Sequence, residues 1–369
     1  MNKIKTKQCL KMIIVGAALG LSNLTFAAAP AYTITDLGAP QGYPICTATA
    51  INNPGKVLGS CYTSDYSAGH AVLWSHGSIT DLGALGATAI NDRGQVAGTG
   101  QVGNDVQPII WSNGTITALG TPPGYLTSQC YPTGIDNAGA VAGYCTTSDY
   151  SVNHAFRWSH GTITELGTLP GGIASAANGI NNAGQVVGYG TYFPDVTNGS
   201  TIESHAILWS HGTLTDLGTL SNTGYDGYNS SIASALNNQG QVVGWSYTTI
   251  GTPPNENITQ HAFLWQRGAM TDLDTLTGGI GSSFATAIND RGQVVGYAFL
   301  ADFSLASFFY DKTTGMVDLS TLLPSNSGWT LYSVTGINNR GQIAAWGYMT
   351  GGDPFAWHAL LLTPVAAQP

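Results

Sequence analysis

Charged residues are scarce in this chain, and basic residues are the scarcest. Asp, Glu, Lys and Arg make up 8% of the 369 residues, with 11 Lys and Arg against 20 Asp and Glu. Four of the basic residues, Lys3, Lys5, Lys7 and Lys11, lie close to the N-terminus. Without these four, seven Lys and Arg remain against 20 Asp and Glu, a formal charge of −13. Nucleic acid is therefore not expected as a partner, because phosphate binding requires a basic surface.

Long apolar runs are also lacking, apart from one at the N-terminus. The Lys-rich start is followed by an apolar stretch, Met12–Leu24, and by a small-residue stretch, Thr25–Ala29. This order is typical of a secretory signal, and the apolar stretch is too short to span a bilayer. We predict a signal peptide over residues 1–28, cleaved after Ala27 or Ala28, and no membrane span. The protein is expected to be exported, either to the periplasm or out of the cell.

A short phrase recurs seven times along the chain. It consists of Ile or Leu, then Asn or Asp, with a glycine four residues after the start. It begins at Ile51, Ile90, Ile135, Ile180, Leu236, Ile288 and Ile337, with spacings of 39, 45, 45, 56, 52 and 49 residues. Repeats of this period are typical of solenoids, propellers and arrays. Most recurrent residues are therefore expected to be scaffold.

The fourth repeat illustrates what one unit builds. Extended runs at 177–181 and 185–189 flank an Asn-Ala-Gly turn, and runs at 205–209 and 213–217 flank a Ser-His-Gly turn. Aromatic and β-branched residues between Gly and Asn predict four short strands in a meander. The strands are apolar on both faces, so each sheet is expected to lie between two neighbours.

The turn sequences predict their own geometry. Asn-Asp-Arg-Gly at 91–94 and 289–292 suits a type I turn followed by a glycine with positive φ. Two-residue hairpins with positive φ are predicted at Asn113-Gly114, His76-Gly77, His160-Gly161 and His211-Gly212.

The two ends of the chain are complementary fragments of one unit. Residues 358–362 form a third strand with no fourth after it, and residues 34–37 form a fourth strand with no unit before it. Pairing them closes a ring. We predict an all-β, seven-bladed propeller over 32–364, four short antiparallel strands per blade, with a short tail at 365–369. An open β-solenoid is the alternative, but it gives no reason for the complementary ends.

Cysteine is also rare, and Cys9 leaves with the signal. The other four lie at two repeated offsets from the phrase, which favours the pairs Cys46–Cys61 and Cys130–Cys145. An even count in an exported chain is typical of disulfides. A site of four thiolates around a metal is the competing interpretation, but no CxxC spacing supports it.

The phrases resemble the HAF-type extracellular repeat family. The His-Ala-Phe run stands at His154-Ala155-Phe156 and His261-Ala262-Phe263, with variants at His70, His205 and His358. Asn-x-x-Gly-Gln-Val-Val-Gly and Thr-Asp-Leu-Gly-Thr-Leu phrases match the same pattern, over residues 32–364. The second and sixth units depart from it at 107–111 and 306–310. The resemblance implies export, mainly from bacteria, and implies no activity.

Loop lengths give the clearest functional signal. The turns between first and second strands and between third and fourth strands are nearly constant. The other two connections vary, and in a meander they emerge on one face of the propeller. Variable loops on a rigid scaffold usually carry binding. The candidate ligand-binding residues in them are Tyr125, Tyr192, Asp195, Tyr225, Asp226, Tyr228, Trp329, Tyr332 and Trp357. The alternative is that these rings only pack the loops onto the blades.

Recurrent histidines and acids are interpreted as scaffold. The histidine pairs His70/His76, His154/His160 and His205/His211 are six residues apart, too far along a strand to share a metal. The repeat-locked acids are Asp36, Asp81, Glu165, Asp216, Asp272 and Asp318 in the fourth strand, with Asp92, Asp136 and Asp290 at the first turn. A hydrolase needs paired carboxylates, and no spacing pairs the remaining acids, such as Asp195, Glu203 and Asp226. We predict no catalytic residue, metal site or cofactor.

These observations favour a monomeric, non-catalytic binding or surface-interaction module, with an extracellular or envelope glycan or protein on the loop-rich face. One alternative is a carbohydrate-active propeller enzyme, a hydrolase or lyase, on the same face. Another is a structural envelope or matrix protein without a discrete site.

Overall fold

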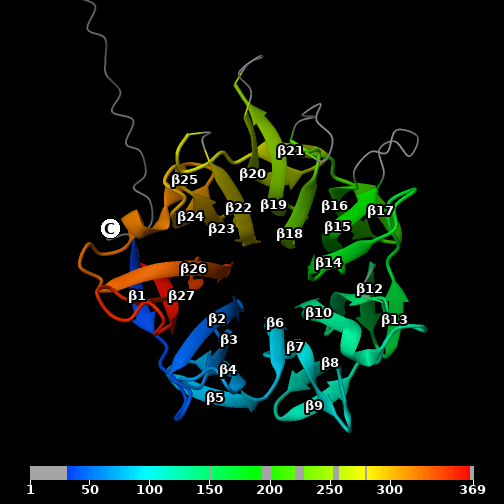
Figure 1. Ribbon diagram of the computed structural model, residues 1–369, viewed down its shortest axis with the longest axis horizontal. Helices are drawn as coiled ribbons and strands as arrows, with labels where there is room; N and C mark the ends of the chain where they lie inside the picture. The colour runs from blue at the N-terminus through cyan, green and yellow to red at the C-terminus, as the bar shows by residue number, and fades with distance from the viewer. Residues whose placement is uncertain are drawn as a thin grey trace, which may run out of the picture.

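The chain forms a ring of seven blades, shown in Figure 1. The structure is a computed structural model and describes residues 31–149, 152–192, 202–220, 228–251, 257–278 and 281–365. In these residues, 28 strands form seven four-stranded antiparallel sheets. The prediction of an all-β, seven-bladed propeller is confirmed.

Each of the first six blades is built from four consecutive strands. Blade 1 contains β2 (Ile45–Ile51), β3 (Val57–Tyr62), β4 (Gly69–Ser75) and β5 (Ser78–Gly83). Blade 2 contains β6 (Gly86–Ile90), β7 (Val96–Val102), β8 (Asp105–Ser112) and β9 (Thr115–Ala118). Blade 3 contains β10 (Cys130–Ile135), β11 (Val141–Thr146), β12 (Asn153–Ser159) and β13 (Thr162–Glu165), after the short 3-10 helix η1 (Thr127–Gln129).

The remaining blades follow the same order. Blade 4 contains β14 (Ser175–Ile180), β15 (Val186–Tyr192), β16 (Glu203–Ser210) and β17 (Thr213–Asp216). Blade 5 contains β18 (Ser231–Leu236), β19 (Val242–Ile250), β20 (Asn257–Gln266) and β21 (Ala269–Asp272). Blade 6 contains β22 (Ser282–Ile288), β23 (Val294–Phe299), β24 (Leu305–Asp311) and β25 (Gly315–Asp318), followed by η2 (Leu319–Leu322). Blade 7 contains β26 (Trp329–Ile337), β27 (Ile343–Met349), β28 (His358–Pro364) and β1 (Tyr32–Asp36).

Blade 7 closes the ring by joining the two ends of the chain. β1 pairs with β28 in register from Tyr32 opposite Pro364 to Asp36 opposite Leu360. In Figure 1 the blue first strand accordingly lies beside the red end of the chain. The closure predicted from the complementary ends is confirmed.

The apolar core lies between blades rather than within one sheet. In β15, Val186 packs on blade 3 while Val187 packs on blade 5, because successive side chains of a strand point to opposite faces. The same alternation builds a separate buried cluster at each of the seven blade interfaces. This arrangement explains why each second strand begins with two consecutive apolar residues.

The predicted turns adopt the expected backbone geometry. Gly94 and Gly292 have φ of 80° and 76°. The first residues of the two-residue hairpins have φ between 48° and 52°, at His76, Asn113, His160 and His211. Positive φ at both residues of each hairpin matches the right-handed twist of the strands.

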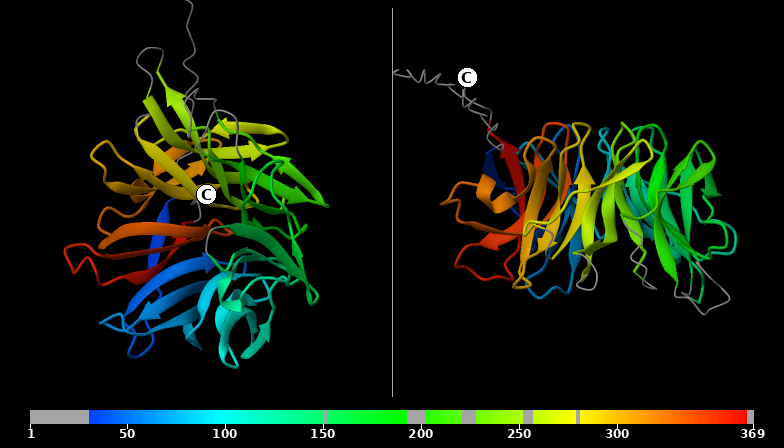
Figure 2. Two further views of the ribbon diagram at one scale, coloured as in Figure 1. Left: turned by 45° about the vertical axis from the view of Figure 1, so that its right-hand side comes forward. Right: turned by 90° about the horizontal axis from the view of Figure 1, so that it is seen from above.

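The two faces of the disc differ in their connections, as the edge-on view of Figure 2 helps to follow. In a four-stranded meander, the first and third turns emerge on one face, which we call the turn face. The connections between second and third strands and between blades emerge on the other, which we call the loop face. The variable loops are therefore on one side, as expected.

Both predicted disulfides are present. Cys46 is bonded to Cys61 and Cys130 to Cys145, and each pair joins directly opposite residues of the first two strands of its blade. Persistent disulfides indicate an oxidising compartment. In the described ranges, no helix is long and apolar enough to cross a membrane.

Candidate functional site

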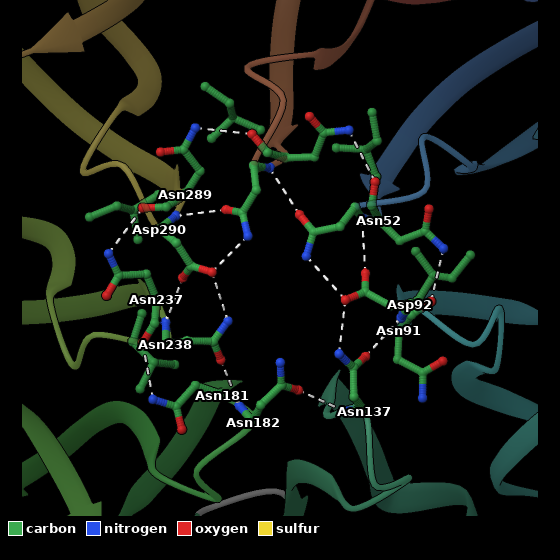
Figure 3. Close-up of a pocket in the computed structure, with 18 of the residues that line it drawn as sticks. Asn52, Asn91, Asp92, Asn137, Asn181, Asn182, Asn237, Asn238, Asn289 and Asp290 are labelled. Atoms are coloured by element: carbon green, nitrogen blue, oxygen red, sulfur yellow. Dashed lines mark hydrogen bonds between the residues drawn. The ribbon is translucent and has the colours of Figure 1, made fainter.

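A belt of asparagine side chains surrounds the centre of the turn face (Figure 3). The first belt position is the Asn of the repeated phrase, and its amide donates to the backbone oxygen of the same position in the next blade. Asn338 Nδ2, for example, lies 3.1 Å from Asn52 O, across the junction of blade 7 and blade 1. Blade 3 has Asp136 instead, which accepts from the backbone N–H groups of Ala138 and Ala140. The first position thus joins six of the seven blade pairs.

The second belt position is the residue that follows the first one, and its side chains form an unbroken ring. Its members are Asn53, Asp92, Asn137, Asn182, Asn238, Asp290 and Asn339. In every blade its backbone N–H donates to the side-chain oxygen of the next blade, over 2.8–3.0 Å. The carboxylates of Asp92 and Asp290 each accept two further amide donors. Burial alone would raise the pKa of Asp290, but hydrogen bonds from Asn238 and Asn339 hold it below its ordinary value.

A cavity of about 210 Å³ lies inside this belt. Its carboxylates, Asp92 and Asp290, each accept three hydrogen bonds from backbone or amide N–H groups, so the belt links neighbouring blades. This agrees with the interpretation of the turn acids as scaffold.

On the loop face, histidine and carboxylate form a repeated pair. The histidine begins the third strand, and the acid ends the fourth strand beside it. Nδ1–carboxylate distances are 2.8–2.9 Å in four blades and 3.8 Å in blade 3, for His70–Asp81, His154–Glu165, His205–Asp216, His261–Asp272 and His358–Asp36. These pairs join the recurrent histidines and the recurrent fourth-strand acids, both predicted to be scaffold, in five of the seven blades.

Several predicted ligand residues pack onto this scaffold. The Tyr125 hydroxyl lies 2.7 Å from Nδ1 of His154, and burial together with the Glu165 carboxylate raises its pKa. Trp357 holds blade 7 to blade 1, because its backbone oxygen accepts from Cys46 N at 2.8 Å. Tyr125 and Trp357 are therefore partly structural.

Other predicted residues remain open to solvent. Tyr228 and Tyr332 are each 45% exposed. Tyr332 stacks on Trp346 with ring centroids 4.6 Å apart, and Trp357 closes the cluster at 4.8 Å from Tyr332. Tyr192 ends β15. Asp195, Tyr225 and Asp226 lie outside the described residues, so the predicted group is only partly placed.

Blade 6 departs from the histidine–carboxylate pattern, and a cavity lies at that point. The register places Ala306 where five other blades have the histidine, while Asp318 keeps the carboxylate position. Asp318 Oδ1 accepts from Ser320 N at 2.8 Å, and Oδ2 has no donor among the described residues. The cavity measures about 400 Å³ and lies between blades 6 and 7 on the loop face.

The walls of this cavity combine an aromatic ring, aliphatic groups and unpaired polar atoms. Trp329 lines it, next to Leu323 and Leu331. Ser307, 7% exposed, also lines it, and its buried Oγ has no hydrogen-bond partner in the described part of the chain. Apolar and polar residues contribute about equally to the lining of this cavity.

The sequence analysis included Trp329 but missed Asp318 and Ser307. The repeat predicts Asp318 to be scaffold, because it occupies the same fourth-strand position as the other recurrent acids. The signal was present, since histidine and acid are 11 residues apart in blades 1, 3, 4 and 5. In blade 6 the acid lacks that histidine. Glu203, one of the off-repeat acids, is 1% exposed and accepts from Asn229 Nδ2 at 3.2 Å.

No protein-family model matches this chain, and no curated protein matches it. Among solved structures it is similar to one from a study of two prolyl endopeptidases, with 10% identity, 92% of this chain covered and a TM-score of 0.46. The chain spans 51% of that protein. It is also similar to the β-propeller domain of the trilobed protease from Pyrococcus furiosus, with 10% identity, a TM-score of 0.36 and coverage of 76% of this chain and 99% of that one. A third is the Aleuria aurantia lectin, with 12% identity, a TM-score of 0.33 and coverage of 89% and 100%.

Proposed function

We propose that this protein is an exported, non-catalytic binding module of the HAF-repeat type, and that its loop face holds a glycan. The observation that carries the proposal is the cavity between blades 6 and 7. Trp329, Asp318 and Ser307 line it, and in the described part of the chain neither Asp318 Oδ2 nor the Ser307 hydroxyl has a hydrogen-bond partner. The two disulfides support an oxidising compartment outside the cytoplasm.

The chemistry of the cavity suits a sugar ring. A pyranose has an apolar face of C–H groups, which can stack on an indole, and hydroxyl groups around its rim. A carboxylate oxygen accepts hydrogen bonds, and a serine hydroxyl both donates and accepts. Asp318 and Ser307 thus complement sugar hydroxyls, while Leu323 and Leu331 exclude water from the apolar face.

The same cavity argues against hydrolysis. Glycoside hydrolysis generally uses two carboxyl groups, about 5–10 Å apart, on either side of the scissile bond. Asp318 is the one carboxylate among the described residues that line this cavity. Binding therefore fits the geometry better than catalysis.

The experiment is a glycan array probed with the chain starting at residue 29. We expect binding to a restricted set of glycans, with a loss of about tenfold or more in Trp329→Ala and Asp318→Asn. Tyr66→Ala is the control, because Tyr66 is an exposed loop-face aromatic of blade 1, 51% exposed. Unchanged binding in both cavity variants, or the absence of any glycan ligand, would refute the proposal.

A further inference from the structure

Blade 3 differs from the other blades at two positions. The first follows the turn glycine and carries a long polar side chain in six blades, at Lys56, Gln95, Gln185, Gln241, Gln293 and Gln342, whereas blade 3 has Ala140. The second lies in the third strand and is apolar in six blades, at Leu73, Ile110, Leu208, Leu264, Phe309 and Leu361, whereas blade 3 has Arg157. The paired changes put a positive charge into an apolar position.

The Arg157 side chain takes the place of the missing glutamine. In blade 4, Gln185 Oε1 lies 3.5 Å from a Cβ placed on Gly240, the turn glycine of blade 5. Arg157 Nη2 stands in the same relation to Gly184, the turn glycine of blade 4, at 3.4 Å. The guanidinium thus covers the neighbouring turn, as a carboxamide does elsewhere.

Unlike Gln185, Arg157 has no hydrogen-bond acceptor among the residues that the structure describes. Gln185 accepts from Asn181 Nδ2 at 2.8 Å and donates to Ser210 Oγ at 3.2 Å. Arg157 Nε is buried without a hydrogen-bond partner among the described residues. The Glu165 carboxylate lies 3.8 Å from His154 Nδ1. A buried, unpaired N–H of a charged group is costly, so its presence requires an explanation.

A second unpaired donor lies on the same cavity. Trp209 is 5% exposed, and its Nε1–H has no hydrogen-bond partner among the described residues. The corresponding indole of blade 1, Trp74, donates to Gly38 O at 3.0 Å. The cavity lined by Arg157 and Trp209 measures about 470 Å³, and Glu165 and His211 also line it. Its counterpart around Trp74, which Gln342 helps to line, measures about 340 Å³.

We propose that this cavity between blades 3 and 4 binds a carboxylate group. The guanidinium supplies positive charge and donors whose planar arrangement fits a carboxylate, and the Trp209 N–H adds a neutral donor. The net charge of the chain is negative, so long-range attraction does not favour an anion. Recognition depends on contact within the cavity, where screening by salt is weak.

The site is independent of the proposed glycan cavity, because it lies at another blade interface and on the turn side of the sheets. The carboxylate that binds there is part of either a free small acid or an acidic sugar. Sodium acetate and sodium glucuronate distinguish these two sources, and glucose serves as the uncharged counterpart of glucuronate.

The test is isothermal titration calorimetry of the chain from residue 29 with these three compounds. We expect saturable binding of at least one carboxylate and none of glucose. Arg157→Leu, which installs the residue that blade 7 has at Leu361, should weaken binding by about tenfold or more, as expected for loss of a charged hydrogen bond. Trp209→Phe, which removes the indole N–H but keeps an aromatic ring, should weaken it by several-fold.

Two controls keep the result decisive. Circular dichroism establishes that each variant is folded, and Arg157→Lys tests the fork geometry while keeping the charge. Binding that is equal in wild type, Arg157→Leu and Trp209→Phe would overturn the proposal. So would an absence of carboxylate binding by the folded wild type. Trp329→Ala should leave this site unchanged, which separates its failure from that of the glycan cavity.

Discussion

At the residue scale, the repeated histidine–carboxylate pair joins the third and fourth strands in five of the seven blades. Burial alone would raise the pKa of Asp81, but hydrogen bonds from His70 and from Gly83 N–H hold it below the ordinary value. Burial alone would likewise raise the pKa of Asp216, but hydrogen bonds from His205 and Gly218 N–H hold it below the ordinary value. Because the folded state lowers these pKa values, it binds protons less readily than the unfolded chain does.

The pH dependence of stability follows from this direction. A carboxyl whose pKa is lowered by folding contributes stability above its unfolded pKa, about 3.9 for Asp. That contribution is lost as the pH falls from this value through the lower folded pKa. We expect urea unfolding to show a loss of stability below about pH 4, and His70→Ala to reduce the part that depends on Asp81.

A titration of individual carboxyl groups by NMR checks the cause. In His70→Ala, the pKa of Asp81 should rise toward its ordinary value. Asp65, in the same blade, is an internal control, since hydrogen bonds from Thr63 and Ser67 lower its pKa to about 2 without involving His70. An unchanged Asp81 pKa in the variant would contradict the assigned role of the pair.

At the element scale, each disulfide fixes the register of two neighbouring strands. The cysteines are 15 residues apart in both pairs and at most 1% exposed. A cross-link that closes a loop of this length lowers the entropy of the unfolded chain. In blade 1 and in blade 3, the disulfide therefore links the first strand covalently to the second.

We expect the double variant Cys46→Ala/Cys61→Ala to fold but to lose about 2–4 kcal/mol of unfolding free energy. Chemical denaturation of the oxidised protein measures the loss. Reductant should destabilise the wild type more than this variant, which keeps one bridge. Free thiols in the unreduced wild type would contradict both pairings.

At the scale of the whole molecule, the ring depends on β1 completing blade 7. Tyr32 in β1 is 1% exposed and packs edge-on against Phe309 of blade 6, with ring centroids 6.2 Å apart. Burial raises the pKa of its hydroxyl, which has no hydrogen-bond partner among the described residues. The ring of Tyr32, rather than its hydroxyl, therefore stabilises the closure.

Tyr32→Ala should destabilise the protein by about 3–5 kcal/mol, the usual cost of removing a buried aromatic ring. Tyr32→Phe keeps the ring and removes an unpaired buried hydroxyl, so it should cost nothing or stabilise the fold. Thermal and urea unfolding of the three proteins provide the comparison. Equal stability of Tyr32→Ala and wild type would mean that the first strand does not close the ring.

The sequence predicted the architecture well because its signals are local and repeated. The turn glycines predict the hairpins, and paired Val residues such as Val186 and Val187 predict a sheet packed on both faces. The complementary ends of the chain predict the closed ring. The proposed sites were harder to predict, since each lies where one blade lacks a residue that most other blades have. Neither Ala306 nor Arg157 stands out in the sequence on its own. Comparison with the other blades shows that Asp318 lacks its histidine and that the Arg157 guanidinium replaces a glutamine. Tyr125 is predicted as a ligand residue from its loop alone, and the structure adds that its hydroxyl lies 2.7 Å from His154 Nδ1.

The central claim is that the missing histidine of blade 6 opens a glycan site. Ala306→His restores the residue that five other blades have beside the acid, so the imidazole should pair with Asp318 and occupy the carboxylate oxygen that blade 6 leaves without a donor among the described residues. The direct measurement is calorimetric titration of wild type and Ala306→His with the glycan selected on the array. We predict that the variant keeps or gains thermal stability and loses binding by about tenfold or more. Undiminished binding by a folded Ala306→His protein would contradict the account.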